Sequence, residues 1–412
     1  MATVIVLGGC GAVGSVAVKT LAAQDVFSQI IIADISEKRA ETVMSEISQN
    51  TITYRKVNAE DPQSIRDAIG GCDLVVNCIG PFYKTVKIIL EQVIDAKINY
   101  VDVCDDVDVT LDIFKWHEKA KNAGITALIG MGSSPGATNL LAKFAADHLL
   151  DETEAIDIFH AHGGEPVEGE GVIGHRFHCM SIDIPMYLDG KLQYVKFFEE
   201  NGKSLRQTFD FPALGNGIPV YPYPHPEQVT IPDYIDLKQV TNRGTVLPDP
   251  YYTLTKDVCK AGLSSREPVM VKGQPVIPYD FAMAYILRER ERILQETNFG
   301  GQRGCCSVVA TGKKDGKYRQ YRFHMASQSE ALGEGTGIPA AIGAMLMQQG
   351  KIVEKGVLPP EGCVNPVDFI DLITKVMHLD KKGKKDKNSH DQFSGVLVQQ
   401  IDENGNIETI DI

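Results

Sequence analysis

The chain has 412 residues, of which 43% are hydrophobic and 23% are charged, and its formal net charge at pH 7 is −13. This length predicts two or three domains. The acidic balance argues against nucleic acid as a main partner. No apolar run approaches the roughly eighteen residues that a membrane-spanning helix needs, so no membrane partner is expected. The nine cysteines are scattered without a C-x-x-C pair, which favours reduced thiols and predicts a cytoplasmic protein.

A glycine cluster near the N-terminus separates a strand pattern from a helix pattern. Thr3–Leu7 is apolar and β-branched, like a strand buried on both faces. The motif Gly9-x-Gly11-x-x-Gly14 then opens a helix, which is the context of a dinucleotide-binding fingerprint. Gly9 would permit the tight turn, Gly11 would let the backbone approach a pyrophosphate, and Gly14 would let helix and strand pack closely. A glycine-rich turn without a ligand is the alternative.

A carboxylate follows at the position where this motif needs one. The second strand pattern, Ile30–Ala33, ends in Asp34, twenty residues after the last glycine of the motif. A carboxylate there accepts hydrogen bonds from the adenine ribose and repels a 2′-phosphate, so the sequence favours NAD over NADP. Two alternatives stay open: Lys38 and Arg39 could pair with a 2′-phosphate, and Asp34 could only cap the next helix.

Strand and helix patterns alternate over about the first 130 residues, which predicts a Rossmann-type α/β fold, a doubly wound parallel sheet with right-handed crossovers. The strand patterns are Val4–Leu7, Ile30–Ala33, Thr51–Val57, Leu74–Cys78, Tyr100–Val103 and Thr126–Ile129. Ligands of such a sheet bind beyond the carboxyl ends of its strands. The residues predicted to bind the cofactor are Gly9, Gly11, Ala12, Val13, Gly14, Asp34, Ile35, Ala59, Asn77, Ile79, Gly80 and Pro81.

The alternation stops after the first third of the chain. Between residues 156 and 323 strand patterns dominate, and "CCSVVATGKKDGKYRQYRFHMAS" (305–327) predicts a β-hairpin. This region is therefore expected to be an α+β domain with mainly antiparallel sheet. The segment "GTGIPAAIGAMLMQQGK" (335–351) predicts a strongly apolar helix, and the end of the chain predicts a second hairpin that turns at Asn404-Gly405. The short basic run 381–387 is expected to be a solvated loop.

Five segments resemble the saccharopine dehydrogenase family in order and spacing. They are "GGCGAVG", "VVNCIGPF", "YVDVCDD", "GMGSSPGATNLLA" and "GTGIPAAIGAMLMQQGKIVEKGVLPPE". Members include saccharopine reductases, lysine epsilon-dehydrogenases and carboxynorspermidine dehydrogenases. The resemblance implies an NAD(P)-dependent oxidoreductase that transfers hydride at a C–N bond of an amino acid or polyamine derivative. It does not single out one member, so the substrate stays open.

The resemblance also implies a domain organisation. Residues 1–135 would form the dinucleotide-binding domain, joined by a returning C-terminal helix at about 334–378. Residues 136–333 would bind the substrate and form the contact of a homodimer, and residues 379–412 would form a C-terminal hairpin segment.

Hydride transfer at a C–N carbon needs a positioned substrate and one proton acceptor, because the cofactor supplies the hard step. Substrates of this class are zwitterions, so their pocket should offer a carboxylate and a cation. Asp105, after the fifth strand pattern, is predicted to hold the amine or take its proton. Its neighbour Asp106 is predicted to bind substrate or to cap the next helix. Further predicted substrate-binding residues are Ser134, Arg176, Arg243 and Lys256.

Four histidines lie close together in the sequence. His160 and His162 are two residues apart on a predicted strand and so share one face, and His175 and His178 follow. Four imidazoles could bind zinc. Chance histidines on a strand are commoner, and the chemistry of the family needs no metal, so no metal site is predicted. His162 is instead predicted to be a catalytic proton carrier that lines the pocket.

Two other functions stay open. Tyr83-x-x-x-Lys87 has the spacing found in short-chain reductases, which reduce a carbonyl. It follows the fourth strand pattern, where those enzymes do not carry their tyrosine. A non-catalytic dinucleotide sensor would keep the cofactor fold but lack a charged pocket in the middle of the chain.

Overall fold

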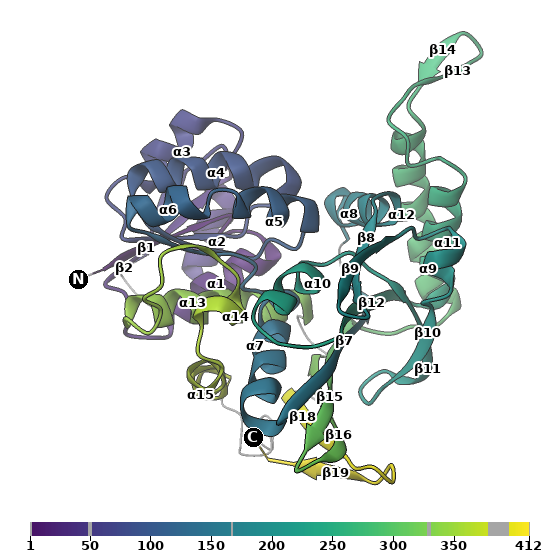
Figure 1. Cartoon of the computed structure of the whole chain (residues 1–412). Helices are drawn as coiled ribbons and strands as arrows, with labels where there is room; N and C mark the ends of the chain where they lie inside the picture. Colours follow the sequence, from purple (N-terminus) through teal and green to yellow (C-terminus); the bar gives the residue numbers. More distant parts are fainter. Residues whose placement is uncertain (1, 48–51, 166–167, 328–330, 378–394, 412) are drawn as a thin grey trace.

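The computed structural model describes residues 2–47, 52–165, 168–327, 331–377 and 395–411. Figure 1 shows two halves, one built on a parallel sheet and one on a long mixed sheet. The seven strands of the first sheet are all parallel, in the order β17-β6-β5-β4-β1-β2-β3. They are β1 (Thr3–Leu7), β2 (Gln29–Asp34), β3 (Ile52–Lys56), β4 (Leu74–Asn77), β5 (Asn99–Asp102), β6 (Thr126–Leu128) and β17 (Gly356–Leu358). The predicted Rossmann-type sheet is confirmed.

Helices cover both faces of this sheet, because its strands are apolar on both sides. Val4–Leu7, for example, is completely buried. One face packs against α1 (Ala12–Ala22) and α13 (Ala331–Gln348), and the other against α3, α4, α5 and α6. The remaining bounds are α2 (Glu37–Ser45), α3 (Pro62–Ile69), α4 (Phe82–Ala96), α5 (Val107–Phe114) and α6 (His117–Ala123).

Helix α13 comes from the far end of the chain and packs directly on α1. A Cβ at Gly337 would lie 2.5 Å from the carbonyl oxygen of Val13, so the two helices can approach this closely only with glycine there. The domain bounds given above stay a prediction.

The second sheet has ten strands and is mainly antiparallel, as predicted; β7 and β12 form its parallel pair. Its main order is β10-β11-β12-β7-β15-β16-β18-β19, with β8 beside β12 and β9 beside β8. The strands are β7 (Glu152–Gly163), β8 (Ile184–Leu188), β9 (Lys191–Val195), β10 (Gln207–Phe211), β11 (Gly215–Pro222), β12 (Gln239–Leu247), β15 (Arg303–Lys314), β16 (Lys317–Ser327), β18 (Gly395–Ile401) and β19 (Ile407–Ile410). Both predicted hairpins are present, as β15–β16 and β18–β19.

Helices surround the mixed sheet and link it to the parallel one. They are α7 (Ala137–Phe144), α8 (Glu170–Ser181), α9 (Glu200–Lys203), α10 (Glu227–Thr230), α11 (Asp249–Lys260), α12 (Pro278–Glu296), α14 (Pro360–Cys363) and α15 (Pro366–Val376), with a π-helical turn at Ala145–Leu149 and a 3₁₀ turn at Ile231–Asp233. The hairpin of β13 (Val269–Val271) and β14 (Gln274–Val276) projects beyond α12 as an arm (Figure 1). Among the described helices, none is long and apolar enough to cross a membrane.

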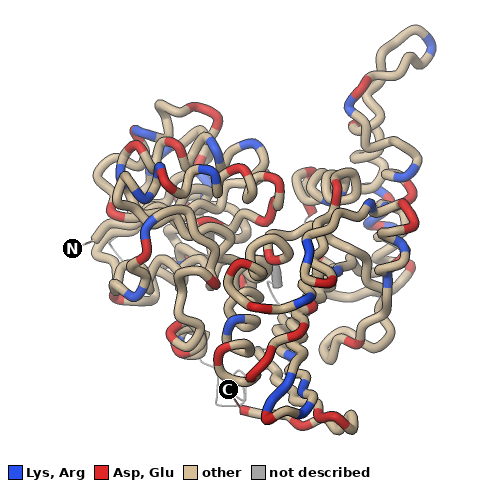
Figure 2. Tube along the Cα trace, viewed as in Figure 1, with Lys and Arg blue, Asp and Glu red and all other residues tan. Residues whose placement is uncertain are grey.

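Acidic and basic residues are interspersed over both halves of the molecule, as Figure 2 shows. The basic run 381–387 lies outside the described residues, as do Thr51 of the third strand pattern and all residues from 378 to 394.

Candidate active site

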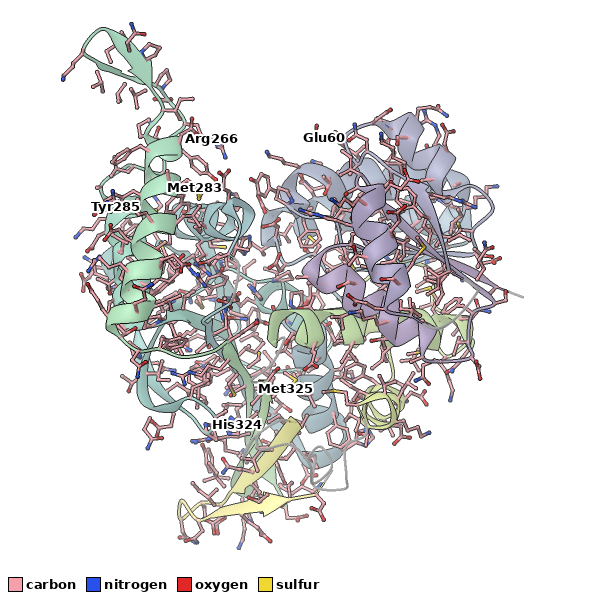
Figure 3. All side chains as sticks on the ribbon, turned by 180° about the vertical axis from the view of Figure 1, so that it is seen from behind. Glu60, Arg266, Met283, Tyr285, His324 and Met325 are labelled. Atoms are coloured by element: carbon pink, nitrogen blue, oxygen red, sulfur yellow. The ribbon has the colours of Figure 1, made fainter. Side chains whose placement is uncertain are left out.

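A cavity of about 570 Å³ lies between the carboxyl ends of the parallel strands and the mixed sheet. Its lining comes from the loops after β4, β5 and β6 and from α13 on one side, and from β7, β15, β16, α8 and the loop after β11 on the other. Met325, labelled in Figure 3, belongs to the β16 part of this wall. The polar and charged lining residues are Asp105, Asp106, Ser133, Ser134, His160, His162, His175, Arg176, Tyr223, His225, Ser327, Glu334 and Thr336. Ligands of open α/β sheets bind at this edge.

The glycine loop leaves the N-terminus of α1 open. Gly8 has a φ of 74°, so the left-handed turn falls at Gly8 and not at Gly9. Gly11 is the exposed N-cap of α1, so the first N–H groups of the helix have no side-chain cap. A Cβ at Gly14 would lie 2.1 Å from the carbonyl oxygen of Gly8, which makes glycine necessary for this close approach. The loop therefore fits a pyrophosphate group at the helix N-terminus.

Asp34 lies at the end of β2, beside the glycine loop. Its Oδ2 accepts a hydrogen bond from the backbone N–H of Cys10 at 3.3 Å, and its Oδ1 accepts one from the N–H of Ser36 at 3.1 Å. The side-chain cap of α2 is Ser36, whose Oγ accepts from the N–H of Arg39. Asp34 therefore does not act as that cap. The next side chain, Ile35, is 66% exposed and offers an apolar surface beside the carboxylate.

The other predicted cofactor residues divide into loop-shaping and cavity-lining groups. Asn77 is fully buried; its Nδ2 donates to the hydroxyl of Tyr100, and its Oδ1 accepts from the N–H of Ile79. Asn77 therefore fixes the loop after β4 and does not face the cavity. Val13, Gly80 and Pro81 line the cavity, whereas Ala12 and Ala59 lie outside its lining.

Asp105 and Asp106 follow β5 and have different surroundings. Asp106 is buried; its Oδ2 accepts from the N–H of Tyr83 at 2.9 Å, and its Oδ1 lies 3.2 Å from Nδ1 of His175. Asp106 is the N-cap residue of α5, but its side chain makes no hydrogen bond to that helix. The Asp105 side chain is 32% exposed, and its Oδ2 lies 3.6 Å from Nε2 of His175. Asp105 is therefore the carboxylate of this pair that is open to a ligand.

The imidazole of His175 lies between these two carboxylates. Burial alone would lower the pKa of His175, but the Cys179 sulfur and the carboxylates of Asp105 and Asp106 raise it well above 6.5. Burial raises the pKa of Asp105, and the charge of His175 opposes that rise. The electrostatic result is an imidazolium held between two carboxyl groups of the opposite wall.

His160 and His162 both line the cavity, as expected for alternate residues of a strand. Nδ1 of His162 lies 2.5 Å from Oε1 of Glu165. Burial would raise the pKa of Glu165, but this contact holds it at about 2. Burial also lowers the pKa of His160 well below 6.5, so its ring is neutral. The catalytic role of His162 stays a prediction.

The four histidines do not converge on one point. Nε2 of His178 lies 3.4 Å from Oδ2 of Asp108, and its ring stacks on Tyr83 at a centroid distance of 5.4 Å. Within the described ranges, the groups close enough to share a metal ion are Asp105–Asp106–His175 and Asp106–Asp108–His178. In the first group the two nitrogens of one imidazole face different carboxylates, which is the arrangement of ion pairs.

Arg176 lines the cavity from α8, but its guanidinium is already paired. Glu168 forms an ion pair with Nη2 of Arg176, and its other oxygen lies 2.8 Å from Nε of Arg290. The hydroxyl of Tyr251 donates to the same Glu168 at 2.6 Å. Arg290 also lies 3.1 Å from Oε1 of Glu291, so the two arginines are matched by two carboxylates. A ligand carboxylate beside Arg176 would share its guanidinium with Glu168.

Arg243 lies outside the cavity lining. Its Nη1 is 3.4 Å from Oδ1 of Asp157, and its Nε donates to a backbone carbonyl. The preceding residue of β12, Asn242, contacts Ser134 of the cavity wall. Because side chains alternate along a strand, Arg243 faces the opposite side of the sheet.

Lys256 also lies outside the cavity lining, on α11. Its Nζ donates to the hydroxyl of Tyr221 at 2.6 Å. The same Nζ lies 5.1 Å from the ring centroid of Tyr252. These contacts give Lys256 a packing role against two aromatic rings and do not bring it to a substrate.

Sequence reasoning missed a hydrogen-bonded chain in the cavity wall. The hydroxyl of Ser134 donates to Oε1 of Glu227 at 2.5 Å, and it lies 3.1 Å from Nδ1 of His225. Thr138 donates to the same Glu227 oxygen at 2.8 Å, and Nδ2 of Asn242 donates to Ser134 at 3.4 Å. His225 and Glu227 are separated from Ser134 by 91 and 93 residues. No local sequence motif predicts the contact of Ser134 with these two residues. The sequence indicates it only through a histidine and a glutamate two residues apart in a proline-rich segment.

The first part of the chain matches a known protein family. Residues 4–128 match the family described as the saccharopine dehydrogenase NADP binding domain. This segment is similar to the nucleotide-binding domain of the saccharopine dehydrogenase family. The resemblance seen in the sequence is confirmed, and with it the expectation of an NAD(P)-dependent oxidoreductase. The matched residues include the glycine loop, Asp34 and the loop after β5.

Several known proteins are similar to this chain over nearly its whole length. A carboxyaminopropylagmatine dehydrogenase of Synechocystis sp. is 25% identical over 88% of this chain and 92% of its own length. A carboxynorspermidine synthase of Vibrio alginolyticus is 27% identical over 89% of this chain and 94% of its own length. Among solved structures, the apo saccharopine dehydrogenase (L-Glu forming) of Saccharomyces cerevisiae has a TM-score of 0.65 at 15% identity, over 91% of this chain and 97% of that one. The last likeness concerns the fold.

Proposed function

We propose that this protein transfers hydride between a nicotinamide dinucleotide and a C–N bond of a carboxyl-bearing polyamine derivative, or reduces the matching imine. The observation that carries this proposal is the cavity, which extends from the N-terminus of α1 to the mixed sheet. It offers the open carboxylate of Asp105 and the guanidinium of Arg176, which a ligand carboxylate would share with Glu168. A non-catalytic sensor would have no use for such a charged cavity.

The names of the full-length relatives support the substrate class. Carboxynorspermidine and carboxyaminopropylagmatine, which appear in those names, both denote amines that carry a carboxyl group. A substrate of this kind would place an ammonium group near Asp105 and its carboxylate near Arg176. The carboxylate of Asp106 already contacts the N–H of Tyr83 and the ring of His175. We therefore propose that Asp106 orients His175 and does not bind the substrate directly.

The cofactor is proposed to be NAD in preference to NADP. The carboxylate of Asp34 lies beside the glycine loop, where the adenine ribose would lie, and Asp34 is not the side-chain cap of α2. A 2′-phosphate there would meet that negative charge. The description of the matched domain names NADP, so the comparison of both cofactors is an essential measurement.

A single assay tests the reaction. The protein would be mixed with NAD⁺ or NADP⁺ and with carboxynorspermidine, carboxyaminopropylagmatine, saccharopine or a 2-hydroxy acid, and absorbance would be followed at 340 nm. We expect turnover of a carboxylated polyamine and a lower or zero rate with the hydroxy acid. Turnover of the hydroxy acid alone would overturn the proposed reaction class.

We propose that the protein is a homodimer whose arm contacts the second copy. All six residues of β13 and β14 are exposed, and Met270 at 68% is the most exposed large apolar side chain of the arm. An isolated two-stranded hairpin is marginally stable, so a partner surface would stabilise it. Arg266, labelled in Figure 3, lies at the base of the arm. Light scattering should give a dimer for the unmodified protein and a monomer for Met270→Asp; an unmodified monomer would overturn the proposal.

A cytoplasmic location is proposed from the cysteines. All nine are free thiols, and six of them are buried. Free thiols persist in a reducing compartment. Activity recovered in the soluble cytoplasmic fraction of lysed cells would support this location, and recovery from a secreted fraction would overturn it.

A further inference from the structure

His225 lies at the junction of the two halves of the molecule. It belongs to the loop between β11 and α10, its side chain is 6% exposed, and it lines the cavity. Its ring stacks on His160 at a centroid distance of 5.6 Å and meets Tyr223 edge-on at 5.3 Å. These aromatic contacts fix the plane of the imidazole, so its two nitrogens have fixed directions.

The surroundings of Nδ1 determine which nitrogen of His225 carries the proton. Nδ1 lies 3.1 Å from Oγ of Ser134 and 3.2 Å from Oε2 of Glu227. Burial acts against the charge of Glu227, but the His225 ring and Ser134 lower its pKa, so it is a carboxylate at neutral pH. The single hydroxyl proton of Ser134 is directed to Oε1 of the same Glu227. Only a protonated Nδ1 suits both neighbours, because a lone pair there would face a carboxylate.

The other nitrogen is then a free proton acceptor. In the part of the chain that the structure describes, Nε2 of His225 has no hydrogen-bond partner. Ser134 and Glu227 thus hold the imidazole in one tautomer, as the carboxylate does in other histidine bases. When His225 carries a proton on both nitrogens, its charge lowers the pKa of Asp105, so the two side chains act on the same part of the cavity.

We propose that Nε2 of His225 exchanges the proton of the reacting substrate nitrogen, with Ser134 and Glu227 as positioning residues. This inference rests on the proposed function. In the oxidative direction the substrate ammonium gives its proton to Nε2, which leaves a lone pair on nitrogen. The carbon then loses a hydride to the oxidised nicotinamide, which is reduced, and the nitrogen lone pair forms the C=N bond of an iminium. The imidazolium returns its proton to water, and the reductive direction reverses these steps.

Other titratable groups of the cavity are less suited to this step. His175 lies between two carboxylates that raise its pKa well above 6.5, so it is protonated and cannot accept. Burial lowers the pKa of His160 well below 6.5, so it accepts a proton poorly. Nδ1 of His162, at the end of β7, is already paired with Glu165.

The tautomer can be measured without any turnover. Nitrogen-15 NMR of protein labelled at histidine would separate protonated from unprotonated ring nitrogens, and the His225 signals would be those missing in His225→Asn. We expect a protonated Nδ1 and an unprotonated Nε2 at pH 8, with the two forms mixed in Glu227→Gln. A protonated Nε2 in the unmodified protein would overturn the inference.

Kinetics test the catalytic role. The asparagine of His225→Asn can still donate to Ser134 but has no equivalent of Nε2, so kcat/KM with the carboxylated polyamine should fall by about 10²–10⁴-fold. Ser134→Ala should lose less, about 10-fold, and shift the acid limb of the pH profile, while cofactor affinity stays unchanged. His148→Asn, outside the cavity lining, is the matched control and should keep full activity.

The outcomes are distinguishable. Full activity in His225→Asn, or a large loss in His162→Gln with none in His225→Asn, would overturn the role of His225 while the proposed function stands. No turnover of any carboxylated amine by the unmodified enzyme would overturn the proposed function, and this inference with it.

Discussion

Nδ1 of His175 lies 3.2 Å from Oδ1 of Asp106, and this contact joins α8 of one half of the molecule to the loop after β5 of the other. His178, one turn later on α8, makes a parallel contact with Asp108. The helix that closes the cavity is therefore held to the parallel-sheet half by two histidine–carboxylate pairs. Only the first pair is well buried, so it should dominate the energetics.

Replacing His175 should remove a pH-dependent part of the stability. The pKa of His175 is raised well above its unfolded value of 6.5 by Cys179, Asp105 and Asp106, against the effect of burial. Its stabilising effect is therefore complete below pH 6.5 and is lost as the pH rises through the folded value. We expect His175→Gln to cost about 1.5–3 kcal/mol at pH 6, the range of a charged hydrogen bond, and less at high pH.

Urea unfolding of both proteins from pH 6 to pH 10 measures this difference. His178→Gln is the matched control on the same helix; its partner Asp108 is half exposed, so its cost should be smaller. A cost of His175→Gln that does not change with pH would contradict the raised pKa.

Substitutions in the glycine loop should separate folding from cofactor binding. A Cβ at Gly14 would lie 2.1 Å from a backbone oxygen, so Gly14→Ala should lower the melting temperature strongly. A Cβ at Gly11 would meet its nearest atom at 3.4 Å, so Gly11→Val should fold. Its side chain would occupy the position of the pyrophosphate and abolish binding. Calorimetry with NADH and NADPH measures this; unchanged affinity in folded Gly11→Val would contradict the assigned cofactor site.

The fold was predictable because it depends on local patterns. Continuous apolar strands such as Val4–Leu7 and the glycine motif carry their own signal, and Asp34 stands at a fixed distance from that motif. Among the cavity side chains, Asp105 was predictable because it follows a strand of the parallel sheet, and His162 and Arg176 of the other half were also expected there. Arg243 was misplaced because the face of a strand cannot be chosen without knowing one of its contacts. His225 was missed because its partner Ser134 lies 91 residues away.

Asp34 should set the preference between NADH and NADPH. If its carboxylate binds the adenine ribose, Asp34→Ala should weaken NADH binding by about 10- to 150-fold, the equivalent of a charged hydrogen bond of about 1.5–3 kcal/mol. NADPH should bind equally well or better, because a negative charge next to the 2′-phosphate is removed. Dissociation constants for both cofactors test this, with Glu41→Ala on the exposed side of α2 as the control. An unchanged ratio of the two constants would show that Asp34 only orders the loop.

Asp105 should matter for the substrate and not for the cofactor. Asp105→Asn keeps the size of the side chain and removes its charge, so binding of a substrate ammonium should lose about 1.5–3 kcal/mol. We expect kcat/KM to fall by about 10- to 150-fold and cofactor affinity to stay the same. Asp108→Asn is the control, since Asp108 pairs with His178 and lies outside the cavity lining. An Asp105→Asn enzyme with unmodified kinetics would remove Asp105 from the site.

Glu361 should make the protein less stable at alkaline pH. This buried carboxyl group of α14 accepts a hydrogen bond from Nδ2 of Asn139 at 2.9 Å, and burial raises its pKa to about 7. Because the folded pKa lies above the unfolded value of 4.5, the group favours folding fully below pH 4.5 and loses that effect as the pH rises through 7. This difference between the folded and unfolded pKa values lowers the free energy of unfolding by about 3 kcal/mol at pH 8.

Glutamine resembles the protonated acid at every pH, so Glu361→Gln should remove this loss. We expect equal stability of the two proteins near pH 4 and a variant more stable by about 2–3 kcal/mol at pH 8. Urea unfolding at both pH values provides the measurement. Glu60, labelled in Figure 3, is exposed, so Glu60→Gln should have no such effect and is the control. A Glu361→Gln protein that is less stable at pH 8 would mean that the ionised carboxylate is satisfied in the folded state, contrary to its burial.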